Sequence, residues 1–432
     1  MLLILSVLIK PFIKIGKFNI GLYWIICLVG ALAILISGAI PLSTVIAGIT
    51  ENTSVNPLKI LTLFISMTVI SLFLGDSGFF GVIADKIFQK TNHGGLKLFL
   101  ILYAVVSFLT VFTSNDIIIL TFTPPICLFC KKAKVSPVPY LFAEFVAANT
   151  WSMALIIGNP TNIYLASASG ISFAEYLKVM LLPTIIGGIT SLFILLLLFR
   201  KQLLAKTPAK IEANCSHVGN PHMSPRTYKV DRPLMIVSLV SLLAVIILLA
   251  LSNVTGIEMW MVCLSFAVAL VIFSIIYYIV KDKSLHHTLK VVGGAPFELV
   301  PFVLSMFIIV LSLKECGFTQ MIGELLITNG KKDGVIFGLS TALVSNLLNN
   351  IPASVLFEKI ISLNSIPAVY GSIIGSNIGA FITPVGALAG IMWNKILRAF
   401  DVKFSFGKFI LYGIIVAVPT LLGTTFALFI TL

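Results

Sequence analysis

Charge is scarce in this sequence. Only 10% of the 432 residues are Asp, Glu, Lys or Arg, whereas 58% are hydrophobic. Soluble domains carry about 25% charged residues, because their surfaces must be largely polar. A soluble fold could not hide this many apolar side chains from water, and the lipid bilayer is the solvent that suits them. The composition therefore predicts an integral membrane protein.

Signatures of several other protein classes are missing. The sequence has no phosphate-binding Walker loop, so no ATPase domain is expected in this chain. Its six cysteines are scattered and do not predict a disulfide framework. The sequence shows no arrangement of a nucleophile and a base that would predict an enzyme. We also expect no metal site, and no cofactor beyond a coupling proton or sodium ion. The net charge of +13 lies in short stretches, which argues against nucleic-acid binding.

Those short basic stretches set the predicted topology, because cytoplasmic loops are rich in Lys and Arg. If residues 10–17 are cytoplasmic, the basic stretches at 131–134, 200–232, 281–290 and 394–403 fall on the same side. The basic stretches share one side only if two of the apolar runs are hairpins, each of which enters and leaves the membrane on the same face. We expect about ten spans in the cell inner membrane, with the N-terminus outside.

The two runs in question, 98–130 and 334–364, are long and have polar centres. The first contains TSND at 113–116, and the second contains SNLLNNIP at 345–352. Backbone groups inside lipid must be satisfied within the protein, which a helical hairpin buried among other helices can achieve. Each run is therefore predicted to be a re-entrant helical hairpin whose arms cross about half of the membrane.

Two further runs are interrupted by residues that break helices. GNPTN at 158–162 interrupts the run 138–167, and GSNIGAFITPVG at 375–386 interrupts the run 366–392. Gly, Pro and Asn release backbone groups from the helical hydrogen-bond ladder. Those groups need partners, which a bound solute or ion can supply, so each run is predicted to be a broken transmembrane helix.

The motifs occur in the same order in both halves of the chain. GDSGFF, TSND and GNPTN in the first half correspond to KECGF, SNLLNNIP and ITPVG in the second half, which enters from the opposite face. The fold predicted is an all-α integral membrane protein of two inverted-topology repeats, each with a re-entrant helical hairpin and a broken transmembrane helix. The predicted divisions are N-terminal spans at 1–56, beginning with a short span at 1–9; transport repeat 1 at 57–199; a cytoplasmic linker at 200–232; connecting spans at 233–290; and transport repeat 2 with the C-terminal span at 291–432.

The two tips and two breaks are predicted to converge near the bilayer midplane. Their amides, hydroxyls and helix ends suit a small oxyanion, a neutral polyhydroxyl solute or a sodium ion. Asn and Ser also join helices without binding anything, but four clusters at repeat-related positions favour a binding site. The predicted solute- and ion-binding residues are Ser114, Asn115, Asp116, Asn149, Asn159, Thr161, Asn162, Asn346, Asn349, Asn350, Asn377 and Thr383.

Two acids lie within the apolar runs of the first half. An acid at mid-membrane costs about 2.5–3.5 kcal/mol, which protonation, pairing or a bound cation can lower. Asp116 is predicted either to carry the coupling ion or to cap the second hairpin arm. Glu144 is expected near a water-filled vestibule or beside a lysine.

The motifs together resemble the ion transporter superfamily, and most closely its arsenite efflux permease branch, the arsenical pump membrane protein-like proteins. The similar segments are GDSGFF, TSNDIIILTFTPPI, GNPTNI, VGGAPFELVPFVLSMFIIVLSLKECGF, NNIP and GSNIGAFITPVGALAGIMW, which follow the branch's order over nearly the whole chain. The resemblance implies secondary active efflux of arsenite or antimonite in exchange for protons, optionally driven by a separate soluble ATPase.

The sequence also departs from that branch. Arsenite permeases carry an acid where Asn149 and Asn377 stand, and a basic residue near Phe381. Paired asparagines look more like the sodium sites of related dicarboxylate symporters. The alternatives are therefore a sodium-coupled symporter of small (di)carboxylate or inorganic anions, and a sodium/proton antiporter. Expected partners are a small solute, membrane lipid, a second copy of the chain and a soluble ATPase subunit.

Overall fold

The computed structural model describes residues 12–15, 18–52, 56–91, 95–204, 230–281, 285–328, 330–361 and 365–432. The predicted first span at 1–9 and most of the predicted linker lie outside these residues. Strands β1 (Phe12–Ile15) and β2 (Phe18–Gly21) form an antiparallel hairpin near the N-terminus. All of the remaining described elements are helical, which confirms the all-α class.

The order of helices after residue 56 occurs twice. In each half, an apolar helix and a shorter one precede a helical hairpin, an interrupted helix and a long final helix. This order agrees with two repeats, whereas the inverted orientation of the second copy stays a prediction. The helices are α2 (Leu22–Ser37), α3 (Leu42–Thr50), α4 (Pro57–Asp76), α5 (Phe79–Lys90), α6 (Gly95–Phe112), α7 (Asn115–Ala133), α8 (Val138–Trp151), η1 (Ile156–Gly158), α9 (Pro160–Ala168), α10 (Phe173–Leu204), α11 (Arg232–Ala250), α12 (Ser252–Thr255), α13 (Met259–Val280), α14 (His286–Gly293), α15 (Leu299–Glu315), α16 (Phe318–Leu326), α17 (Asp333–Leu348), α18 (Asn350–Ile360), α19 (Ile366–Gly379), α20 (Leu388–Ala399) and α21 (Phe406–Thr431).

Six described helices are long and apolar enough to cross a membrane unaided, namely α4, α6, α10, α11, α13 and α21. A seventh span results if α15 and α16, which meet at an angle of 78°, are counted together. The arms of the first hairpin are longer than the half-membrane prediction, because α6 has 18 residues and α7 has 19. In the second hairpin the returning arm, α18, is short at 11 residues.

Both hairpin tips lie where the polar residues predicted them. α6 ends at Phe112 and α7 begins at Asn115, so the first turn takes two residues. The second turn is a single residue, Asn349, whose φ of 81° lies in the left-handed region. With ψ at 156°, this is a backbone conformation that residues other than Gly rarely adopt, and the tip holds it with a cap in which the Asn349 side-chain oxygen accepts from the Ile351 N–H of α18. The local chemistry of the tip thus explains the tightness of the turn.

The two broken helices break at positions that differ from the prediction. The first break begins earlier, because α8 ends at Trp151 and α9 starts only at Pro160. The second break begins later, because α19 continues to Gly379 and α20 starts at Leu388. Gly375 therefore lies inside a helix, where the sequence had placed the start of a break.

Close helix packing explains why Gly375 is a glycine. A Cβ atom at Gly375 would lie 2.2 Å from the Gly338 carbonyl oxygen of α17. The same contact recurs one turn earlier and one turn later along the two helices, so small residues let the backbones approach. We call this contact the glycine seam; it joins Gly371, Gly375 and Gly379 of α19 to Gly334, Gly338 and Ala342 of α17.

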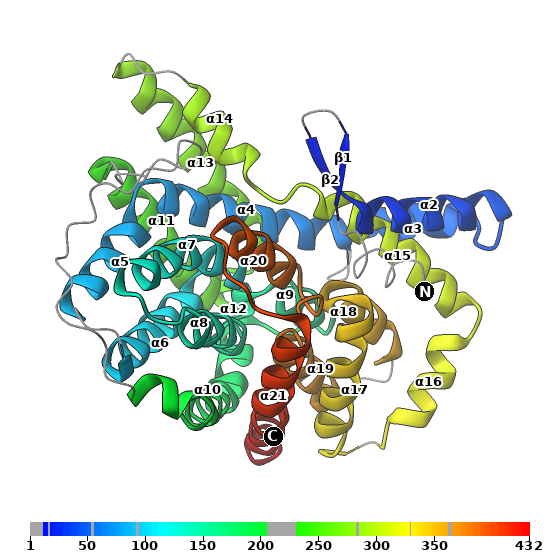
Figure 1. Cartoon of the computed structure of the whole chain (residues 1–432). Coiled ribbons are helices and arrows are strands. Elements are labelled where there is room, and N and C mark those ends of the chain that lie inside the picture. The colour runs from blue at the N-terminus through cyan, green and yellow to red at the C-terminus, as the bar shows by residue number, and fades with distance from the viewer. Residues whose placement is uncertain are drawn as a thin grey trace.

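The broken helices occupy the middle of the molecule. Figure 1 shows α8, α9, α19 and α20 between the first hairpin, α6–α7, and the second hairpin, α17–α18. The long helices α10 and α21 pack against each other and against the broken helices, and α4 lies on the other side. This arrangement brings the tips and breaks of both halves to one central region.

Candidate functional site

The first hairpin tip contacts the first broken helix. The Asn115 side-chain nitrogen donates to the Asn149 side-chain oxygen at 3.1 Å. Asn149 is itself oriented by its helix, because its nitrogen donates to the Phe145 carbonyl at 2.8 Å. The Asn115 oxygen accepts from the Asp116 backbone N–H at 2.9 Å and lies 3.5 Å from the Ser114 hydroxyl. Residues predicted at two separate motifs therefore form one contact.

Asn377 joins the two halves of the chain. Its side-chain oxygen accepts from the Ser152 hydroxyl at 2.9 Å and from the Asn159 side-chain nitrogen at 2.8 Å. Its nitrogen donates to the Asn162 oxygen at 2.7 Å and to the Ile373 carbonyl at 2.8 Å. A side-chain amide has two donor and two acceptor positions, and each of those of Asn377 has a neighbour within hydrogen-bonding distance, although Ser152 shares its single hydrogen between the Asn377 oxygen and the Asn149 carbonyl.

The first break is stabilised by its own side chains. The Asn162 nitrogen donates to the Ser152 carbonyl, which the interrupted helix ladder leaves free, and to the Leu155 carbonyl, which also accepts from the Gly158 N–H. Thr161 lies across from α19, with its hydroxyl 3.1 Å from that of Ser376. At Gly158 a Cβ atom would lie 2.3 Å from the Ser152 carbonyl oxygen, so the turn requires glycine there. GNPTN therefore closes the break as well as supplying polar groups.

The second hairpin tip contacts the second break. The Thr383 hydroxyl donates to the Asn346 oxygen at 2.7 Å, and the Asn346 nitrogen donates to the Gly379 carbonyl at 3.0 Å. The Asn349 nitrogen donates to the Val385 carbonyl at 3.2 Å. The Asn350 backbone N–H donates to the Gly386 carbonyl at 3.0 Å. Each tip thus contacts the broken helix of its own half.

Ser152 connects the separate contacts. Its hydroxyl lies 2.8 Å from the Asn149 carbonyl and 2.9 Å from the Asn377 side-chain oxygen. Together with the last turn of α19, this links both tips and both breaks. We call the linked set the amide network; it comprises Ser114, Asn115, Asp116, Asn149, Ser152, Asn159, Thr161, Asn162, Asn346, Asn349, Asn350, Ser376, Asn377 and Thr383. It contains all twelve residues predicted from the sequence.

Three groups at the tips keep unused hydrogen-bonding capacity. The Asn350 side-chain oxygen and the Ser345 hydroxyl are buried and have no partner among the described residues. Asp116 is partly buried, and its carboxylate makes no hydrogen bond or ion pair with the described part of the chain. Buried polar groups are normally satisfied, so unpaired groups such as these are candidates for contact with a solute or ion.

Asp116 also lies in the neighbourhood of residues from outside the two hairpins. It lies near enough to Tyr23 of α2 to act on that hydroxyl electrostatically, and Tyr23 donates to the Glu298 carboxylate at 3.0 Å. Sequence reasoning missed Tyr23, Glu298, Ser345 and Ser152. Ser152 follows Asn149 by three residues and Ser345 lies within the second tip motif, so position could have identified both. The described residues contain no group of three His, Cys, Asp or Glu side chains that could hold a metal ion.

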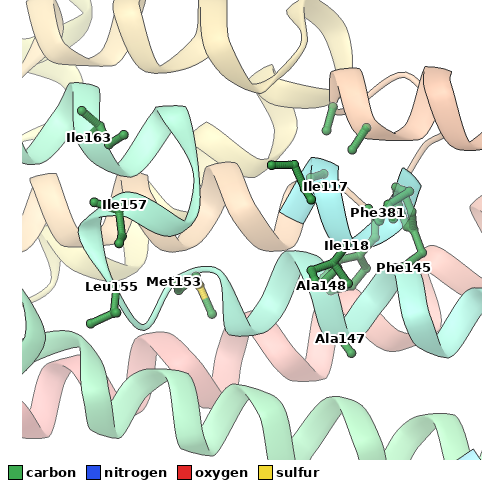
Figure 2. Close-up of a cluster of buried hydrophobic side chains, with 14 of the residues drawn as sticks. Ile117, Ile118, Phe145, Ala147, Ala148, Met153, Leu155, Ile157, Ile163 and Phe381 are labelled. Carbon is green, nitrogen blue, oxygen red and sulfur yellow. The ribbon is translucent and has the colours of Figure 1, made fainter. Parts of the chain in front are cut away.

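Apolar side chains surround the amide network. Figure 2 shows Ile118 of α7 beside Phe145 and Ala148 of α8, with Met153 and Leu155 along the first break. These residues belong to one buried cluster and exclude water from the backs of the polar groups. Hydrogen bonds are electrostatically stronger in such surroundings, and unpaired polar groups are more costly. The apolar cluster therefore favours occupation of the free groups at the tips.

A cavity of about 470 Å³ opens on another face of the molecule. Its lining comes from the start of α4, from the segment between α9 and α10, and from residues around the start of α13. All three segments are predicted to be outside the cell. At its wall the Lys59 ammonium pairs with the Glu258 carboxylate at 2.5 Å.

Comparison with known proteins places the chain in a family. The model of the citrate transporter family matches residues 12–362. The chain is 29% identical over 385 residues to an arsenical pump membrane protein of Escherichia coli (strain K12), with 84% of each chain covered. It is 27% identical over 379 residues to an arsenical pump membrane protein of Yersinia enterocolitica, again with 84% of each chain covered. A 46 kDa membrane protein of Mycobacterium leprae is 25% identical over 374 residues and 83% of each chain.

Among solved structures, the Alcanivorax borkumensis YdaH transporter matches with a TM-score of 0.45 and 14% identity, covering 99% of this chain and 95% of the other. The family assignment does not depend on that match, because the family model alone covers most of the sequence. The chain belongs to the citrate transporter family, and it is a multi-pass membrane protein that acts as a secondary transporter and not as an enzyme.

Proposed function

We propose that this transporter exports arsenite or antimonite in exchange for protons. The observation that carries the proposal is the alignment with arsenical pump membrane proteins over 84% of both chains. An alignment of that length covers most of both chains, so we expect the hairpin tips and helix breaks to be arranged as in those relatives. The same proposal includes the division into two repeats, the proton as coupling ion, a second copy of the whole chain as partner, and a soluble ATPase subunit.

The chemistry of the site suits this solute. Arsenite at neutral pH is an uncharged molecule with three hydroxyl groups, each of which can donate and accept a hydrogen bond. The free groups at the tips are an amide oxygen, a hydroxyl and a carboxylate, at Asn350, Ser345 and Asp116. Repeat-related tips that meet at a central site are typical of alternating-access transporters. Asp116 then provides the group that binds a proton in exchange for the solute.

A second candidate is sodium-coupled transport of a small carboxylate. It is favoured by the description of the family model and by Asn149 and Asn377, which stand where arsenite permeases carry acids. Hard cations prefer oxygen ligands, and the broken helices supply carbonyl and amide oxygens. Against it, Asn377 already uses its oxygen within the protein.

Arsenite accumulation in an efflux-deficient host separates the two candidates. Cells that express the chain should accumulate less arsenite than cells with an empty vector, at matched levels of folded protein. Equal accumulation would contradict arsenite export. In that event, sodium-stimulated uptake of citrate or a dicarboxylate into vesicles would support the second candidate.

The substitution Asp116→Asn tests the coupling role in the same assay. Asn keeps the size of the side chain and caps helices about as well as Asp, but it cannot bind a proton or balance a cation. Gradient-driven arsenite efflux should therefore fall at least about tenfold in everted vesicles. Glu175→Gln, an exposed acid that caps α10 through Ser172, is the matched control and should leave efflux unchanged. Near-normal efflux in Asp116→Asn would show that the acid does not carry the coupling proton.

A further inference from the structure

Glu144 is completely buried in the middle of α8. At about 1.5 Å per residue it lies roughly 9 Å from the start of the helix at Val138 and roughly 7.5 Å from Asn149. The sequence predicted a water-filled vestibule or a lysine partner at this position. Both expectations are wrong for the described residues, because Glu144 is 0% exposed and takes part in no ion pair there.

The hydrogen bonds around Glu144 indicate which atom holds the proton. The Thr123 hydroxyl of α7 lies 2.5 Å from the Ile119 carbonyl and 3.0 and 3.1 Å from the two carboxyl oxygens of Glu144. A hydroxyl has one hydrogen to donate, and the shorter bond goes to the carbonyl, which can only accept. The contact with Glu144 then needs its hydrogen from the carboxyl group. The geometry points to a neutral carboxylic acid that donates to the Thr123 oxygen.

Two other neighbours agree with a neutral acid. The Trp393 indole of α20 is buried, has no hydrogen-bond partner within the usual distance in the described chain, and lies near the Glu144 carboxyl. An indole N–H only donates, so it cannot accept the acid O–H and leaves the Thr123 oxygen as the acceptor; it also carries no full positive charge that would balance a carboxylate. The titratable neighbour from α7 is the buried Cys127 thiol, which carries no positive charge to balance a carboxylate.

The same two helices form the first part of the amide network. α7 and α8 are joined by Thr123 and Glu144 at one level and by Asn115 and Asn149 at another. A movement that separates α8 from α7 at the solute site therefore disturbs the Glu144 contact too. An ionised carboxylate would lose the O–H that bonds to Thr123 and would need water, so protonation favours the packed arrangement.

We propose that Glu144 is a proton-binding residue of the transport cycle, neutral in the packed arrangement and ionised when α8 separates from α7 and admits water. In the ionising step the carboxyl O–H bond breaks, the proton passes to water, and the carboxylate is left hydrated. The reverse step restores the acid. Proton binding and solute binding then both shift the equilibrium between packed and separated arrangements of α7 and α8. Each therefore changes the affinity of the protein for the other. The link to arsenite rests on the proposed function, whereas the protonation of Glu144 does not.

Infrared spectroscopy of the full chain in lipid nanodiscs tests the protonation. At neutral pH the wild-type protein should show the carbonyl stretch of a protonated carboxylic acid, and Glu144→Gln should lose it. Glu175→Gln, which removes an exposed acid, should keep the band. A second variant, Thr123→Val, removes the hydrogen-bond acceptor and should shift the band without abolishing it. An unchanged band in Glu144→Gln together with no shift in Thr123→Val would overturn the proposal.

The pH dependence of arsenite binding tests the linkage. The affinity of the purified wild-type protein for arsenite should change with pH. In Glu144→Gln, the total change in affinity over the same pH range should be several-fold smaller. A Glu144→Gln profile that parallels the wild type would refute the linkage, because a merely structural role changes affinity at every pH alike. Lack of arsenite binding by the wild type would contradict the proposed function instead, and the infrared band decides the protonation in either case.

Discussion

Asparagine side chains in the amide network fall into two groups by how fully they are bonded. Asn377 and Asn162 use both the oxygen and the nitrogen within the protein, whereas the Asn350 oxygen has no partner among the described residues. A fully bonded amide contributes to the fold, and an unpaired one is available to a ligand. The residues that sequence reasoning grouped as one binding site therefore divide into a scaffold and a smaller set that can contact solute.

Replacement of Asn377 should damage the fold before it damages recognition. Asn377→Ala leaves Ser152, Asn159 and Asn162 without their shared partner, and each buried group left unsatisfied costs about 1–3 kcal/mol. The thermal midpoint of the detergent-solubilised protein, followed by size-exclusion chromatography, should fall by several degrees. Asn52→Ala, at an exposed position, is the control. An unaltered midpoint for Asn377→Ala would place Asn377 outside the scaffold.

Residue types in the polar motifs could be predicted, but their bonding partners could not. Polar residues inside an apolar run are costly, so their presence at 113–116 and 345–352 marked the tips correctly. That Asn377 pairs with Asn159 and Asn162, more than 210 residues earlier, depends on how the halves pack. Glu144 was misplaced for the same reason, since its surroundings come from α7 and α20.

At the level of helices, a glycine that breaks a helix and a glycine that packs against one look alike in sequence. GSNIGAFITPVG was predicted to be a break throughout, yet its first five residues continue α19 because Gly375 and Gly379 belong to the glycine seam. Only the identity of the facing residues on α17 separates the two cases, and a single sequence does not show which helices face each other.

The glycine seam should not accept a methyl group. Gly375→Ala would place Cβ 2.2 Å from the Gly338 oxygen and 3.0 Å from the Ala342 nitrogen, which are backbone atoms and can move away only if the helices separate. Overpacking of this kind costs about 1–3 kcal/mol, so thermal stability should fall. Gly293→Ala, where nothing lies within 4 Å, should be neutral. Equal stability of the two variants would show that α17 and α19 can separate freely.

The pairing of α4 with α13 should depend on pH. The hydrogen bond from Lys59 lowers the pKa of the Glu258 carboxyl below its ordinary value. A lowered pKa stabilises the folded protein at neutral pH, and this contribution disappears as pH falls through the lowered pKa. The pair is exposed to solvent, so its contribution is at most about 1 kcal/mol. Wild type should melt slightly above Glu258→Gln at neutral pH and together with it in acid; a gap that persists in acid would contradict the ion pair.

For the whole molecule, the central prediction concerns which loops face the cytoplasm. Single cysteines in a cysteine-free background should react with an impermeant maleimide from outside at Asn52 and Thr255. Cysteines at Lys201 and Lys403 should react only in inverted vesicles. All four positions are exposed, so lack of access does not explain a negative result. Labelling of Asn52 and Lys403 from the same side would disprove the inverted orientation of the second half.

The outer cavity bears on how the transporter would respond to membrane voltage. A cavity of about 470 Å³ is large enough to hold many water molecules. Water has a high dielectric constant, so little of the membrane potential falls across a filled cavity, and most of it falls across the apolar layers beyond. A full elementary charge crossing the membrane gains about 2.3 kcal/mol per 100 mV. On the predicted topology, a charge that moves between the hairpin tips and this water-filled cavity would cross only part of that field, so the step that opens toward the cavity is expected to depend only weakly on voltage.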